Sequence, residues 1–295
     1  VGEDGTSGFP LVGVYLTGKE LKAAMEVDAS VTPIMPAAQL YMSGAKYAFN
    51  TKRMFFNRVY DAALTDVTFD ESGDRSFSFA RKPGADTQLR WEEVDKSLID
   101  EAKVFHFGTL SLTDEPVRTA TQKAVAYAKA QGKLISCDPN LRLPLWPDAD
   151  AAKEQMLWSL RQADVVKISD NEVEFLWNCT PEEGADKLLT EFGVSLAMVT
   201  LGPDGCLLKT KTATFRAVCP KVHPVDTTGA GDIFGGSAAY CLLSSGKAPE
   251  ELNEEELAAM GRFACAAAGL SVQRPGGISS VPGKEEILAL LAAGD

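Results

Sequence analysis

From about residue 100, short apolar segments alternate with longer helix-like ones. The strand-like segments are VFHFG (104–108), LISCDPN (134–140), VVKIS (165–169) and AMVTLG (197–202), and helix-like stretches lie between them. This alternation predicts βαβ units and a mostly parallel sheet that helices cover on both faces. Ligands of such sheets bind beyond the carboxyl ends of the strands. We therefore predict an α/β fold with its site in the segments that follow the strands.

The charge and the cysteine pattern exclude several classes of function. With 29 basic and 41 acidic residues the formal net charge is −12, so nucleic acid and anionic membrane are poor partners. None of the six cysteines forms a CxxC pair and there are two histidines, which disfavours a zinc site. Buried free thiols, the absence of a signal peptide and the lack of a membrane-spanning apolar run predict a cytoplasmic protein.

A second, smaller unit is predicted at residues 60–87. ALTDVTF and RSFSFAR each alternate roughly in period two, and DESGD between them is rich in turn formers. This pattern predicts a β-hairpin that serves as a small lid. Residues 1–59 and 88–295 are assigned to the main domain, and no element or function is assigned within 10–58.

The segment from Asp226 to Leu243, DTTGAGDIFGGSAAYCLL, carries the strongest functional signal. It is a glycine-rich turn that runs directly into a helix. The amides of the turn and of the first helical turn have no intrahelical partners, and with the helix dipole they form a site for an anion. Asp232 lies at the start of this helix, where a lone aspartate would read as a cap. The small residues around it favour a ligand site instead.

DTTGAGD followed by a helix of small residues resembles the C-terminal signature of the ribokinase-like (PfkB) carbohydrate kinases. Ser237 departs from the Ala or Gly usual there. The resemblance implies a ribokinase-like fold and MgATP as the phosphate donor. It implies that Asp232 takes the proton from the attacking sugar hydroxyl, and that Gly229, Ala230 and Gly231 hold the γ-phosphate.

Other segments resemble the family in the same order along the chain. VGEDGTSGF (1–9) resembles its VGxDxxG segment, and residues 67–89 resemble its lid strands, most closely those of bacterial fructokinases. Arg81 of this lid either reaches substrate or is an ordinary exposed arginine. FHFGTLSL and DPNLRLPLW place further residues after strands, where they face substrate or form structural turns: Gly108, Asn140 and Arg142.

The nucleotide side is implied by three further segments. In VVKISDNEVEF, Lys167 is a candidate phosphate contact. The family's Asn-x-x-Glu element, which orients Mg²⁺ through water, matches either Asn171 and Glu174 or Ser169 and Glu172, and we prefer Glu172. The remaining implied positions are the nucleotide turn (Thr200, Gly202, Gly205), the adenine side (Cys265) and a K⁺ site (Asp226, Thr228, Gly277, Ser279).

These features predict an ATP-dependent sugar kinase that converts fructose to fructose 6-phosphate, and a homodimer formed through the lid. The resemblance covers residues 1–9 and roughly 60–290. The family's opening strand and Gly-Gly/Asn segment precede the match to VGEDG and have no counterpart here, so we expect the chain from Val1 to be a poor enzyme. The alternative function is therefore a catalytically impaired nucleotide- or sugar-binding protein of the same fold. A dinucleotide-dependent oxidoreductase is disfavoured, because GAGDIFGG lies near the C-terminus with no acidic residue closing a following strand.

Overall fold

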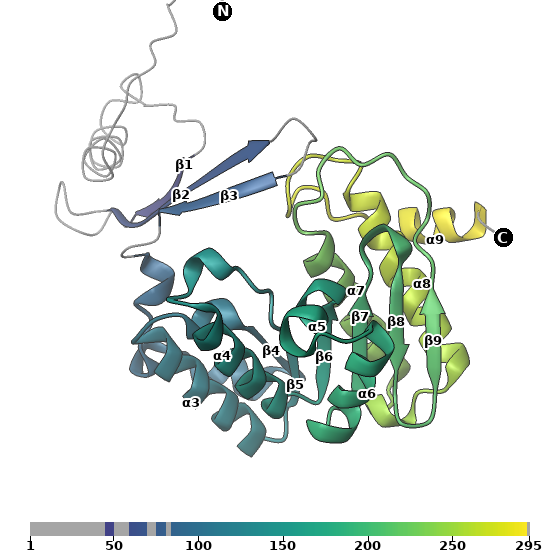
Figure 1. Ribbon diagram of the computed structural model, residues 1–295, viewed down its shortest axis with the longest axis horizontal. Helices are drawn as coiled ribbons and strands as arrows, with labels where there is room; N and C mark the ends of the chain where they lie inside the picture. Colours follow the sequence, from purple (N-terminus) through teal and green to yellow (C-terminus); the bar gives the residue numbers. More distant parts are fainter. Residues whose placement is uncertain (1–44, 50–58, 70–74, 81–83, 294–295) are drawn as a thin grey trace, which may run out of the picture. The chain divides into compact units, whose positions relative to one another are not determined.

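The computed structural model describes residues 45–49, 59–69, 75–80 and 84–293. The chain divides into two compact units, Val1–Gln88 and Leu89–Asp295 (Figure 1). The predicted VGEDG match and Arg81 lie outside the described residues.

The described part of the first unit is a three-stranded antiparallel sheet. It consists of β1 (Ala45–Phe49), β2 (Val59–Phe69) and β3 (Arg75–Ala80), in that order. β2 and β3 pair from Leu64 opposite Ala80 to Phe69 opposite Arg75, as the period-two pattern predicts. β1 lies within residues 10–58, where no element was predicted, and it pairs along β2 with Ala45 opposite Leu64.

The second unit is built on a sheet that has six strands in the described residues. They are β4 (Val104–Gly108), β5 (Leu134–Asp138), β6 (Val165–Ser169), β7 (Leu196–Thr200), β8 (Cys206–Lys209) and β9 (Thr214–Ala217), in sequential order. β4 to β7 are parallel, whereas β8 and β9 are antiparallel. The short connections to β8 and β9 allow hairpins but not the crossover that a parallel pair needs.

The helices of this unit follow the strands as predicted. They are α2 (Lys96–Glu101), α3 (Val117–Ala130), α4 (Ala149–Gln162), α5 (Asp170–Trp177), α6 (Pro181–Glu191), α7 (Ala230–Ser245), α8 (Glu254–Ser271) and α9 (Lys284–Ala293). Short 3₁₀ turns lie at Ala85–Thr87, Trp91–Glu93, Thr109–Leu112, Leu143–Leu145, Gly202–Asp204 and Pro249–Glu251. No helix in the described residues is long and apolar enough to cross a membrane.

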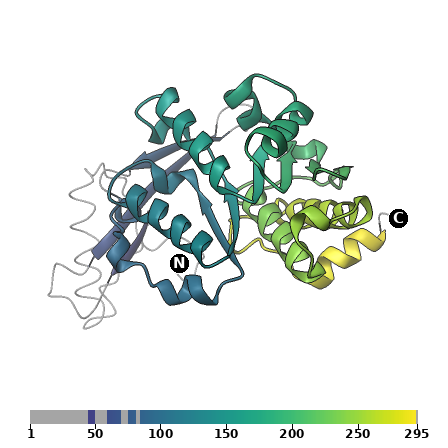
Figure 2. The same ribbon diagram turned by 90° about the horizontal axis from the view of Figure 1, so that it is seen from below.

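Two separate cores lie on the two faces of the six-stranded sheet. One face packs against α3 to α6 through residues such as Cys137, Val166 and Ile168. The other packs against α7 and α8 through residues such as Val165 and Met198. Figure 2 shows α5 and α6 on one side of the sheet and α7 to α9 on the other. Because alternate residues of a strand face opposite sides, this α/β/α layering is the physical basis of the fold class predicted from sequence.

Candidate active site

The start of helix α7 differs from the starts of four other helices of this unit. α4, α5, α6 and α8 begin at residues whose side chains accept an amide hydrogen bond, namely Asp148, Ser169, Thr180 and Asn253. α7 begins at Gly229, which has a left-handed φ of 80° and offers no side chain to cap the helix. Among the described residues, the amides of Gly231 and Asp232 have no hydrogen-bond partner. The first turn of α7 therefore presents free donors at the positive end of a helix.

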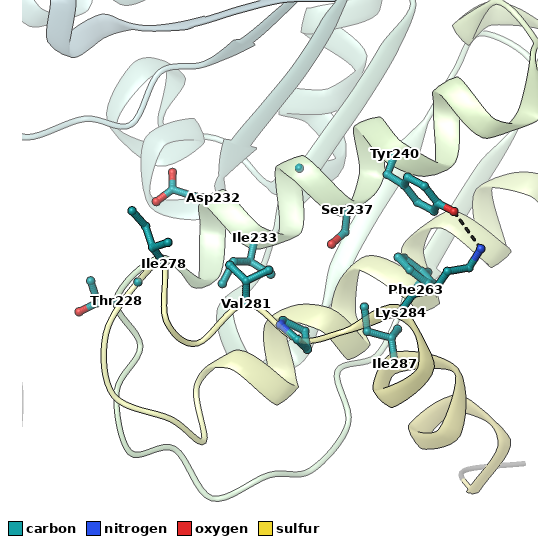
Figure 3. A pocket seen from close by; sticks show the side chains of 14 residues that line it. Thr228, Asp232, Ile233, Ser237, Tyr240, Phe263, Ile278, Val281, Lys284 and Ile287 are labelled. Carbon is teal, nitrogen blue, oxygen red and sulfur yellow. Dashed lines mark hydrogen bonds between the residues drawn. The ribbon is translucent and has the colours of Figure 1, made fainter.

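A groove lies beside this turn and runs along α7 (Figure 3). It has a volume of about 610 Å³, which is within the usual range for small-molecule sites. Asp232 and Thr228 lie at one end, and Tyr240, which accepts a 2.9 Å hydrogen bond from Lys284, lies at the other. Its walls between them are largely apolar, formed by Ile233, Phe263, Ile278, Val281 and Ile287. Asp232 is exposed, so its carboxylate is accessible to a ligand.

Asp226 joins the turn before α7 to the loop after α8. Its Oδ1 accepts the amide of Thr228 and its Oδ2 accepts the amide of Gly276, each at 2.8 Å. A Cβ atom on Gly229 would lie 3.1 Å from the Cα of Gly277, so the two segments are in close contact there. Three of the four residues predicted to hold a monovalent cation, Asp226, Thr228 and Gly277, are therefore brought together. The Oγ of the fourth, Ser279, donates to the Pro275 carbonyl.

A buried ion pair lies beneath the α7 turn. Lys167 Nζ is 2.9 Å from Asp138 Oδ2, and both residues are less than 10% exposed. A Cβ atom on Gly231 would lie 2.9 Å from that same Nζ, so the ammonium lies directly below the first turn of the helix. Burial raises the pKa of Asp138 to about 6; Lys167 opposes this shift, and the negative charges of Glu172 and Asp232 add to it. The predicted phosphate contact thus lies beside the predicted anion site.

The structure separates the two alternatives for the acidic residue of α5. Glu172 is buried: its Oε1 accepts the amide of Leu141 at 2.7 Å, and its Oε2 accepts the amide and hydroxyl of Ser169. Asn171 and Glu174 are exposed and line a different hollow, between α5 and α6. Glu172 therefore connects the end of β6 to the loop after β5, whereas Glu174 faces away from that loop.

The loop after β5 carries the predicted sugar-side residues. Asn140 has a left-handed φ of 50°, and its amide donates to Asp138 Oδ1 at 3.2 Å. A Cβ atom on Gly108 would lie 2.8 Å from the Asp138 carbonyl oxygen, so the end of β4 requires a glycine beside this loop. The guanidinium of Arg142 donates to the Leu141 carbonyl at 2.9 Å. Gly108 and Asn140 therefore lie next to Asp138.

The turn between β7 and β8 holds the predicted nucleotide residues. Thr200 ends β7, and Gly202 and Gly205 both have positive φ. A Cβ atom on Gly205 would overlap the Ala217 carbonyl oxygen at 1.9 Å, so only glycine fits there. Cys265 is 1% exposed and its Sγ lies 3.7 Å from that of Cys206, a contact that raises the pKa of the Cys265 thiol. Its side chain is thus in the protein interior under this turn.

Two polar residues of the sheet were not selected from the sequence. Asp138 ends β5 and precedes Asn140 and Arg142, the predicted residues of the same segment. His106 lies beside Ser136, with 3.1 Å between Nδ1 and Oγ, on the sheet face that Ser136 shares with α7. In the sequence, both residues can be recognised as titratable side chains within short, mostly apolar strands, VFHFG for His106 and LISCD for Asp138.

The sequence matches the family described as pfkB family carbohydrate kinase over residues 61–284. The chain belongs to this family. It is 40% identical over 237 residues to probable fructokinase-2 of Arabidopsis thaliana, a match that covers 80% of this chain and 71% of that protein.

Solved structures of fructokinases share the kinase's fold. One is fructokinase from Xylella fastidiosa with bound ATP, with a TM-score of 0.70, 29% identity, and 79% and 74% of the two chains covered. Another is fructokinase from Vibrio cholerae O395 with fructose, ADP and calcium ion bound, with a TM-score of 0.68, 29% identity, and 77% and 73% covered. The predictions of a ribokinase-like fold, of the PfkB family and of an ATP-dependent sugar phosphotransferase are confirmed.

Proposed function

We propose that the kinase transfers the γ-phosphate of ATP to a hydroxyl of fructose, with fructose 6-phosphate as the product. The observation that carries this proposal is the first turn of α7, where uncapped amides adjoin an accessible carboxylate on Asp232. Phosphoryl transfer requires little more than positioned groups, compensation of negative charge and one base. The turn supplies the donors, Lys167 supplies positive charge and Asp232 supplies the base.

The proposed reaction moves one proton to the enzyme and one phosphoryl group from ATP to the sugar. Asp232 accepts the proton of the attacking sugar hydroxyl, and that oxygen forms a bond to the γ-phosphorus. The bond from the γ-phosphorus to the bridging oxygen of ADP breaks, and ADP leaves with the electron pair. The amides of Gly231 and Asp232, which have no partner among the described residues, donate to the charge on the transferred group. Lys167 lies below the same turn and adds a unit positive charge.

The proposed reaction uses Mg²⁺ with the nucleotide, and a K⁺ ion beside the α7 turn. The described residues hold no cluster of three or more histidine, cysteine or acidic side chains that would bind a metal alone. Mg²⁺ keeps several waters and binds mainly through nucleotide phosphates, so one carboxylate that orients its water, Glu172, is enough. A K⁺ ion would use oxygen atoms where Asp226 joins the two loops.

The assignment of fructose is based on relatives. The Arabidopsis protein is named as a probable fructokinase, and the Vibrio cholerae enzyme binds fructose and ADP. Site geometry adds a constraint, since the groove beside Asp232 has the volume of a small-molecule site. Pairing of two copies through the hairpin at 60–87 is part of the same proposal, and the mass of the protein in solution tests it.

The test is a panel of acceptors assayed with MgATP. Fructose, ribose, adenosine and fructose 6-phosphate are each supplied while ADP formation is followed, and the phosphorylated carbon is identified by NMR. We expect fructose to give the highest kcat/KM, with phosphate at the 6-hydroxyl. A higher value for ribose would refute fructose and leave the family intact. Nucleotide binding without turnover on any acceptor would select the binding-protein alternative.

A further inference from the structure

Asp138 and Lys167 form an ion pair at a depth where most side chains of the sheet are apolar. Both side chains are at most 10% exposed, and the neighbouring residues of the same strands, Cys137 and Val166, are fully buried and apolar. A buried ion pair is seldom more stable than apolar residues of similar size, because both charges lose their water. Stability alone is therefore a weak reason for these two charges to be present here.

The two carboxylate oxygens of Asp138 have different partners. Oδ2 is 2.9 Å from the Lys167 ammonium, and Oδ1 accepts the amide of Asn140. Asn140 is held in the left-handed conformation, which a non-glycine residue rarely adopts without support. One carboxylate thus fixes a residue of β6 and the loop after β5 at once.

The position of the ammonium links this pair to the α7 turn. Nζ lies where a side chain on Gly231 would have to go, so it occupies the space directly under the turn. The Lys167 side chain is long and flexible, so a negatively charged partner on the sheet is needed to hold its ammonium in this position. Asp138 is that partner in the structure.

We propose that Asp138 is a positioning residue for phosphoryl transfer, which holds the Lys167 ammonium under the first turn of α7 and Asn140 in the loop beside it. The proposal rests on the proposed function and adds a residue that does not itself touch substrate. Asp138 acts through Lys167 on the γ-phosphate and through Asn140 on the sugar side.

Four variants separate these effects. Asp138→Asn keeps an oxygen to accept the Asn140 amide but removes the charge that holds Lys167, whereas Asp138→Ala removes both. Lys167→Met removes the ammonium, and the double variant Asp138→Asn/Lys167→Met measures the coupling. The matched control is the pair Lys209–Asp186, which joins β8 to α6 at 2.5 Å and is tested as Lys209→Met and Asp186→Asn.

The first measurement needs no turnover. Affinities for a non-hydrolysable MgATP analogue and for MgADP are compared by calorimetry in each variant, alongside thermal melting to establish that each is folded. Because Lys167 is aimed at the γ-phosphate, Asp138→Asn and Lys167→Met should each lower the preference for the ATP analogue over ADP by about 10-fold. The double variant should lose no more than Lys167→Met alone, and the control variants should leave the preference unchanged.

The second measurement uses the sugar assay. We expect Asp138→Asn to lower kcat by about 10- to 100-fold with a smaller change in the KM for sugar, and Asp138→Ala to raise that KM as well. An unchanged ATP-analogue preference in Asp138→Asn, or additive losses in the double variant, would overturn the proposal and leave a purely structural ion pair. If wild type binds nucleotide but phosphorylates no sugar, the proposed function fails while the affinity ratio still decides the role of Asp138. Wild type that binds no nucleotide would overturn both.

Discussion

The two faces of the six-stranded sheet carry different residues at alternate positions of the same strands. On the face toward α3 to α6, β5 and β6 present Ile135, Cys137, Val166 and Ile168, all essentially inaccessible to solvent. On the α7 face the same two strands begin with the apolar Leu134 and Val165, and further along they present Ser136, Asp138 and Lys167. Toward the carboxyl ends of the strands, neighbouring residues therefore face an apolar core on one side and polar or charged groups on the other.

This difference indicates how one sheet serves both stability and chemistry. The apolar face excludes water and holds the strands in register, which fixes where the carboxyl ends of β5 and β6 lie. The other face can then hold charges under the glycine-rich turn, because their positions are set by the sheet rather than by a flexible loop. Substitutions at adjacent positions should therefore separate loss of folding from loss of activity.

The largest expected effect is that of a charge on the apolar face. Val166→Lys places an ammonium one residue before Lys167 but on the opposite face of the sheet, where Val166 packs among buried apolar side chains. We expect a loss of about 4 kcal/mol or more in the free energy of unfolding, because the buried charge is unpaired. Urea denaturation measures it, with Val166→Met as the control for size. A loss below about 2 kcal/mol would mean that this face tolerates a charge and that the two faces of the sheet do not differ in this respect.

A smaller effect is expected from the titration of Asp138. Burial raises its folded-state pKa from 3.8 to about 6, so the neutral form is favoured in the fold. Its contribution to stability is therefore full below about pH 4 and is lost as the pH rises through about 6, a change of roughly 3 kcal/mol. The difference in unfolding free energy between wild type and Asp138→Asn should fall by about 2 kcal/mol of this total between about pH 4.5 and 7. A difference that does not change with pH would contradict the raised pKa of Asp138 in the folded protein.

The smallest effect concerns the metal. Glu172→Gln should raise the Mg²⁺ concentration for half-maximal activity by about 10-fold, because in the proposed function Glu172 orients a water of the bound Mg²⁺. Glu174→Gln should change it little, since Glu174 lies on the opposite side of α5. Magnesium titrations of both variants decide this point. A larger effect for Glu174 would restore the literal Asn-x-x-Glu register.

Local signals in the sequence predicted most of the second unit. VFHFG and VVKIS coincide with β4 and β6, and DTTGAGD predicted the uncapped start of α7. The position of Glu172 also has a local signal, because Ser169 and Glu172 have the spacing of a capping box. The location of the protein in the cell stays a prediction.

The pairing of Asp138 with Lys167 could not be predicted in this way. The two residues are 29 positions apart, and they meet only because β5 and β6 are adjacent and in a particular register. β1 was missed because its segment has no periodic pattern in the sequence and is defined by pairing with β2. In both cases a partner distant in the sequence determines the structure.

The most direct test of the account is the turnover and nucleotide affinity of Asp232→Asn. The substitution keeps the shape of the side chain and removes the carboxylate that we propose as the proton acceptor, at the end of the groove. We predict that sugar-dependent ADP formation falls by about two to four orders of magnitude while the affinity for a non-hydrolysable MgATP analogue and the melting temperature stay close to those of wild type. Near-wild-type turnover in this variant would contradict the account, because the α7 turn would then lack its base.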